Sequence, residues 1–90
     1  MSVRLKIHPL LCQSTGLQET VDVEGTTVGE CLRHLQRRFP DIRSKLFTEQ
    51  GKLKAFIDVY INNRSTYPQG LDYPVVEGDE LAIMLTLGGG

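Results

Sequence analysis

The stretch of this sequence that most limits the possible folds is Glu80-Leu81-Ala82-Ile83-Met84-Leu85, near the end of the chain. Its odd-numbered side chains place two leucines and an isoleucine on one face of an extended segment, while Ala82 and Met84 leave the other face apolar too. Near-continuous hydrophobicity is typical of a strand inside a sheet rather than at its edge. Residues 80–85 are therefore predicted to form a central strand.

Two segments near the start alternate between apolar and polar residues. Residues 3–7 are apolar at every odd position, and residues 18–24 turn Val21 and Val23 to one face. Pro9 and the turn-forming residues 12–16 separate the two segments, which predicts a hairpin. The polar residues on the outer face of 18–24 indicate an edge strand, where charge deters pairing with other chains.

A helix is predicted after this hairpin. Thr27 and Glu30 have the spacing of a capping box, and Pro40 marks the far end. The apolar stripe follows the helical period at Val28, Cys31, Leu32, Leu35 and Phe39. We expect residues 41–47 to add a helical turn and residues 48–54 to form a loop.

The remaining predicted elements allow a fold class to be assigned. Residues 55–61 alternate as a third strand, Asn62-Asn63 is a turn signal, and residues 65–73 suggest a short edge strand and a tight turn. A hairpin, one crossing helix and a central last strand predict an α+β ubiquitin-like β-grasp: a mixed four- to five-stranded sheet with one main helix on one face and the first and last strands parallel. We assign residues 1–87 to this domain and residues 88–90 to a flexible glycine tail.

Composition narrows the class of protein. The chain has 90 residues, 40% hydrophobic and 23% charged, with a net charge of −1, which fits one soluble domain and argues against a nucleic-acid partner. It shows neither a signal-peptide core nor an apolar run of membrane length. Cys12 and Cys31 lack C-x-x-C spacing, so we expect free thiols and a cytoplasmic location.

Side-chain catalysis is not indicated. His8, His34, Cys12 and Cys31 fall on different predicted elements and lack zinc-ligand spacing. We expect His8 at the surface, His34 as a solvated helix residue, Cys31 in the core and Cys12 in a loop. The chain is thus expected to hold no metal and no cofactor, and not to be an enzyme.

The chain ends Thr86-Leu87-Gly88-Gly89-Gly90. A frayed end is one explanation. The other is chemical: glycines lack Cβ atoms and can enter a channel too narrow for side chains. A carboxylate is a poor electrophile until adenylation supplies a leaving group, after which a sulfur donor can displace AMP and leave a thiocarboxylate.

Several motifs, taken in order, resemble the MoaD/ThiS family of sulfur carriers, and its MoaD-like/CysO-like branch above all. They are Gly51-Lys52-Leu53, Ile57-Asp58-Val59-Tyr60-Ile61-Asn62, Gly70-Leu71, Val76-Glu77-Gly78-Asp79-Glu80-Leu81-Ala82-Ile83 and the glycine end. The resemblance implies a carrier activated at Gly90, with Leu87, Gly88 and Gly89 threading the active site of a partner. That partner would be an adenylating enzyme using ATP and Mg. The other expected partners are a sulfur donor and a sulfur-accepting synthase. The free carrier is expected to be a monomer.

The tail departs from the family pattern. Family members usually end in two glycines after a small tail that often contains proline or alanine, whereas this chain has Leu87 and three glycines. Either Gly90 is activated as it stands, or a peptidase first exposes Gly89. The recipient pathway stays open among cysteine or methionine, molybdopterin, thiamine and a specialised metabolite, and the chain could also be the small subunit of a synthase.

A partner-binding patch is predicted on the sheet face away from the helix, at Phe56, Tyr60, Ala82 and Met84. The alternative is that the loop after Asn63 covers these side chains. Two other functions compete with the carrier: a ubiquitin-like modifier conjugated to lysines through the same glycine, and a plain β-grasp interaction domain.

Overall fold

Five strands form one mixed sheet in the computed structural model, which describes residues 2–13 and 19–86. The strands are β1 (Ser2–Ile7), β2 (Thr20–Glu24), β3 (Ile57–Ile61), β4 (Arg64–Ser65) and β5 (Glu80–Leu85). Their order is β2-β1-β5-β3-β4. β5 is therefore central and β2 lies at an edge, as the sequence predicted. β1 pairs parallel with β5 and antiparallel with β2.

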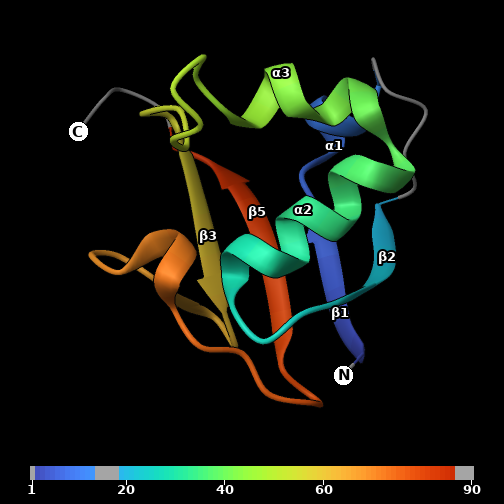
Figure 1. Ribbon diagram of the computed structural model, residues 1–90, viewed down its shortest axis with the longest axis vertical. Coiled ribbons are helices and arrows are strands. Elements are labelled where there is room, and N and C mark those ends of the chain that lie inside the picture. The colour runs from blue at the N-terminus through green and yellow to red at the C-terminus, as the bar shows by residue number, and fades with distance from the viewer. Residues whose placement is uncertain (1, 14–18, 87–90) are drawn as a thin grey trace.

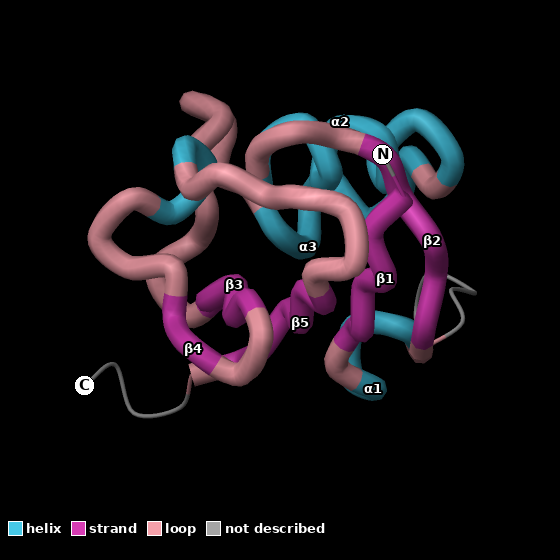
Figure 2. The backbone as a smooth tube through the Cα atoms, turned by 90° about the horizontal axis from the view of Figure 1, so that it is seen from below, coloured by secondary structure: helices cyan, strands magenta, loops and turns pink. Residues whose placement is uncertain are grey.

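Helices lie mainly on one face of this sheet, as Figures 1 and 2 show. The longest, α2 (Val28–Arg38), buries Val28, Cys31, Leu32 and Leu35. A 3-10 turn at Pro40–Ile42 leads into α3 (Arg43–Leu46), and a second 3-10 turn spans Gly70–Asp72. Because α2 and α3 take one face, the other face stays open across β1, β5 and β3.

The core lies between α2 and the sheet. Residues of odd number on β1, β3 and β5 turn inward, and Leu5, Val59, Leu81 and Ile83 are completely buried. Leu32 of α2 is also completely buried, so truncating it to alanine should cost about 2–5 kcal/mol.

The start of α2 follows the predicted capping pattern with one change. The Thr27 hydroxyl accepts the backbone N–H of Glu30 at 3.1 Å. The Glu30 carboxylate does not return to Thr27, as a full capping box requires; it accepts both the N–H and the hydroxyl of Thr26, each at 2.7 Å. Two backbone N–H donors at the entry to the helix, those of Thr26 and Glu30, are thereby satisfied, just as a full capping box satisfies two.

Three predicted boundaries are wrong. A short helix, α1 (Pro9–Cys12), occupies the connection that we expected to be a turn, so Cys12 ends a helix rather than lying in a loop. β2 begins at Thr20, two residues later than the predicted start, Gln18, which lies outside the described residues. β3 begins at Ile57, because Ala55 and Phe56 form a turn.

Candidate functional site

The chain leaves the sheet at a defined point. Ile57 of β3 pairs with Leu85, the last residue of β5. One residue further on, the backbone N–H of Thr86 donates to the carbonyl of Phe56 at 2.8 Å. Figure 1 shows the end of β5 beside the start of β3. The root of the tail is thus held in place, while Leu87, Gly88, Gly89 and Gly90 lie outside the described residues and keep their predicted roles as predictions.

The opposite end of β5 is fixed by two polar side chains. The carboxylate of Asp79 accepts the N–H of Val76 at 2.8 Å and the side-chain amide of Asn62 at 3.0 Å. The Asn62 side-chain oxygen accepts the N–H of Glu80 at 3.0 Å. Gly78 supplies the left-handed backbone of this turn, with φ of +91°. Residues that carried the family resemblance therefore set the register of β5 against β3.

The open sheet face carries most of the predicted patch. Tyr60 lies directly opposite Ala82, and Met84 lies opposite Asp58. Met84 is 40% exposed. The loop after Asn63 does not cover it: Thr66 is buried, and Leu71 approaches Gly29 of α2. That loop passes over the helix side, so the covering alternative is wrong for Met84.

Phe56 is placed differently from the prediction. It precedes β3 instead of lying within it, so the sheet register does not assign it to the open face. Phe56 is 48% exposed, and the ammonium of Lys54 lies 5.9 Å from the centroid of its ring. Phe56 thus stands at the root of the tail, bound to Thr86 through its carbonyl.

A depression beside the patch was missed by the sequence reasoning. It has a volume of about 430 Å³ and is lined by Lys6, His8, Pro9, Ala82 and Met84, among others. α1 supplies one wall, and the His8 ring caps this helix by accepting the N–H of Leu10 at 3.1 Å. Because α1 has only one turn and no hydrophobic period, the sequence pattern did not predict this wall of the depression.

Neither thiol is activated. Burial, and then the nearby Glu19 carboxylate, raise the pKa of Cys12. Burial, and then Glu30, raise the pKa of Cys31, which is completely buried. Reactive cysteines have lowered pKa values, so this chemistry gives neither residue the character of a nucleophile.

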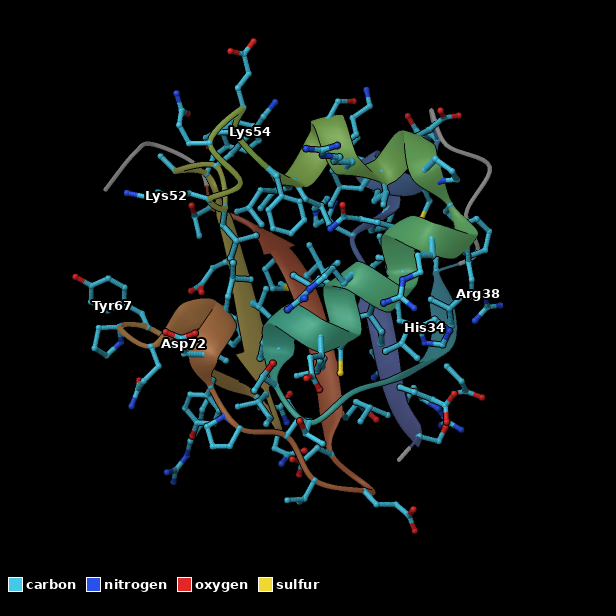
Figure 3. All side chains as sticks on the ribbon, viewed as in Figure 1. His34, Arg38, Lys52, Lys54, Tyr67 and Asp72 are labelled. Carbon is cyan, nitrogen blue, oxygen red and sulfur yellow. The ribbon has the colours of Figure 1, made fainter. Side chains whose placement is uncertain are left out.

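His34 lies on α2 as expected and is half-buried, and its side chain also contacts the edge of the sheet. Its Nδ1 accepts the backbone N–H of Glu24 at 2.7 Å, and the neighbouring Arg38 guanidinium donates to the carbonyl of Asp22 at 2.7 Å. Figure 3 shows both side chains directed from α2 toward β2. These two side chains hydrogen-bond backbone groups of β2, which is an edge strand of the sheet. Their role is therefore structural.

Two negative findings apply to residues 2–13 and 19–86. No cluster of three or more histidine, cysteine or acidic side chains forms there that could hold a metal ion. Within the same ranges, every helix is too short or too polar to cross a membrane.

The order of the strands and the helix packed on one face of the sheet define a class of protein, the ubiquitin-like β-grasp domains. A chain of the Amycolatopsis orientalis BexX/CysO complex superposes with a TM-score of 0.84 at 34% identity, covering 98% of this chain and 99% of that one. SAMP1 of Haloferax volcanii superposes with a TM-score of 0.85 at 30% identity over the full length of both chains. These likenesses confirm the predicted fold.

Sequence comparison gives the family. A candidate sulfur carrier protein of Archaeoglobus fulgidus is 32% identical over 71 residues, covering 78% of this chain and 81% of the relative. The ThiS family pattern matches residues 10–90. The protein belongs to the ThiS family, among small sulfur carriers and ubiquitin-like modifiers.

Proposed function

We propose that this chain is a sulfur carrier, covalently modified by a partner enzyme rather than an enzyme itself. A carboxylate oxygen of Gly90 attacks the α-phosphate of ATP, and pyrophosphate leaves. Sulfur at the oxidation level of hydrosulfide then adds to the acyl carbon and AMP leaves, which gives a C-terminal thiocarboxylate. ATP and Mg belong to the activating partner, and a biosynthetic synthase accepts the sulfur.

One observation supports this proposal above the others. β5 is the central strand, and its backbone is held against β3 as far as Thr86. The four residues that follow can reach at most about 14 Å in extended form. A rigid root and a short glycine tail suit delivery of a carboxylate to a fixed depth in a partner.

The side chains support the same reading. The raised pKa values of Cys12 and Cys31 disfavour a persulfide carried on a thiol. The buried Cys31 forms no disulfide within the described residues, which suits a reducing compartment. The open face around Tyr60, Ala82 and Met84 offers a surface on which the partner could dock.

The test is ATP–pyrophosphate exchange with the adenylating enzyme from the same genome. The full chain should support exchange, and a variant lacking Gly89 and Gly90 should not. Circular dichroism should show an unchanged fold in that variant. Equal binding and equal exchange by the truncated form would favour the plain interaction domain instead.

A modifier function is the second candidate, because SAMP1 of Haloferax volcanii, a small archaeal modifier protein, superposes over the full length of this chain. Both functions need the same activation step. Isopeptide-linked ladders in cells that express the chain would favour the modifier. A thiocarboxylate on the purified protein would favour the carrier.

A further inference from the structure

Two lysines stand beside the root of the tail. Lys52 and Lys54 belong to the loop between α3 and β3, and Figure 3 shows both at the end of the molecule where β3 begins. The Lys54 ammonium lies 5.9 Å from the centre of the Phe56 ring, within the range of a cation–π contact. Since the Phe56 carbonyl binds the N–H of Thr86, one residue links this charge to the tail root.

The loop that carries these lysines is anchored by its backbone. The N–H of Lys54 donates to the carbonyl of the buried Leu46, and its carbonyl accepts the N–H of Ile57, both at 2.9 Å. The carbonyl of Lys52 accepts the N–H of Thr48 at 2.7 Å. The two charges are therefore presented at a defined place relative to the tail.

Neither charge is neutralised by an ion pair in the described part of the chain, where the pair that forms is Lys6 with Glu80 at 2.9 Å. Lys54 shares the lining of a depression of about 750 Å³ with Arg43, Asp41 and Glu49. Two cations and two carboxylates balance there. Lys52, which is exposed, adds an unbalanced positive charge at the tail root.

The length of the tail limits which part of a partner enzyme Lys54 can contact. The reacting carboxylate of Gly90 lies up to about 14 Å beyond Thr86 when the tail is extended. Lys54 stands at the root, so it stays at the mouth of the channel while the tail enters. With the tail extended, the phosphates of a nucleotide at the reacting end would lie beyond the reach of the Lys54 side chain, which leaves the outer rim of the channel as the part of the partner within its reach.

We propose that Lys54, with Lys52 in support, is a docking and specificity residue that binds an acidic rim at the mouth of the activating enzyme's channel. This inference rests on the proposed function. The aromatic face of Phe56 holds the ammonium at the rim, and its charge speeds encounter with an acidic partner. Lys54 takes no part in adenylation itself, so it acts on KM for the carrier and not on kcat.

The experiment measures ATP–pyrophosphate exchange against carrier concentration for four proteins: the wild type, Lys54→Glu, Lys54→Met and Arg37→Glu. Arg37 is an exposed residue of the last turn of α2 and lies between His34 and Arg38 in the sequence. Figure 3 shows His34 and Arg38 on the β2 side of the molecule, away from Lys54. Lys54→Glu should raise KM by about tenfold or more, because like charges then face each other. Lys54→Met, which keeps most of the aliphatic stem, should give a smaller rise. Arg37→Glu, with the same change of charge, should stay within about twofold.

Salt and the partner complete the test. Raising the ionic strength from about 0.05 M to about 0.5 M should shrink the difference between wild type and Lys54→Glu, because screening weakens exposed charge pairs. If the wild type supports exchange and a folded Lys54→Glu variant has the same KM as the wild type, this inference is overturned while the carrier function stands. So would a fall in kcat at constant KM. Absence of exchange with the wild type would instead overturn the proposed function.

Discussion

Replacing Met84 with lysine tests whether the open sheet face docks the activating enzyme. Met84 is 40% exposed and lies opposite Asp58. Aspartate at this position would set two carboxylates across from each other, whereas lysine can pair with Asp58 while removing the apolar contact. Asp58 accepts from Ser65 at 2.8 Å through one oxygen and retains the other. The free energy of unfolding should therefore change by no more than about 0.5 kcal/mol.

The expected loss of binding follows from exposure. Complete burial of a methionine side chain is worth about 1.5–3 kcal/mol. Docking can remove from water only the 40% of Met84 that is still exposed, which leaves about 0.6–1.2 kcal/mol. That energy corresponds to a dissociation constant about three- to eightfold higher. Desolvation of the introduced ammonium adds to this, so we expect about tenfold or more in total.

Calorimetric titration of the carrier into the activating enzyme measures this constant. Met84→Leu is the matched control and should bind within about twofold of the wild type, because it conserves apolar volume. Circular dichroism and urea denaturation confirm that each variant folds. Wild-type affinity in a folded Met84→Lys protein would remove the open face from the docking surface.

Three further predictions concern stability and the tail. Hydrogen bonds from the backbone and hydroxyl of Thr26 hold the pKa of Glu30 below its ordinary range. The stability advantage of wild type over Glu30→Gln should be complete above about pH 4.3, the pKa of glutamate in an unfolded chain, and be lost as the pH falls through the lower folded-state pKa. Urea denaturation across pH checks this, and a pH-independent difference would contradict it. His34→Ala removes the acceptor for Glu24 and should cost about 1 kcal/mol by the same assay, whereas no loss would show that the contact contributes nothing. One alanine appended after Gly90 should abolish pyrophosphate exchange. Deleting Gly90 should slow the exchange, because the reach of the tail falls by about 3.5 Å. Faster exchange by the shortened form would mean that a peptidase must first remove Gly90.

The sheet was predictable because its signals are local. Residues 81–85 are apolar on both faces, and the strand to which they belong has a neighbour on each side. Asn62 and Asn63 connect β3 to β4 with φ of 49° and 70°, the left-handed conformation that asparagine tolerates in a tight hairpin turn. The same two-residue period correctly placed Tyr60, Ala82 and Met84 on one face, since register follows from parity once the inward face is known.

The features that were missed depend on contacts between distant segments. His34 meets the backbone of a residue ten positions away, and nothing in the helical pattern distinguishes it from a solvated side chain. α1 is a single turn capped by a histidine, without the period that marks longer helices. Phe56 continued the alternation of β3 in the sequence, yet the chain turns before Ile57. The depression beside α1 and the lysines at the tail root appear only when these segments come together.

The central claim is that the C-terminal carboxylate carries the sulfur, and intact mass tests it most directly. The purified chain is incubated with its activating enzyme, ATP, magnesium and a sulfur source, and its mass is measured before and after proteolysis. We predict a gain equal to the replacement of one oxygen by one sulfur, located on the peptide that ends at Gly90. Sulfur located on Cys12 or Cys31, or no gain while the enzyme consumes ATP on the carrier, would contradict the proposed function.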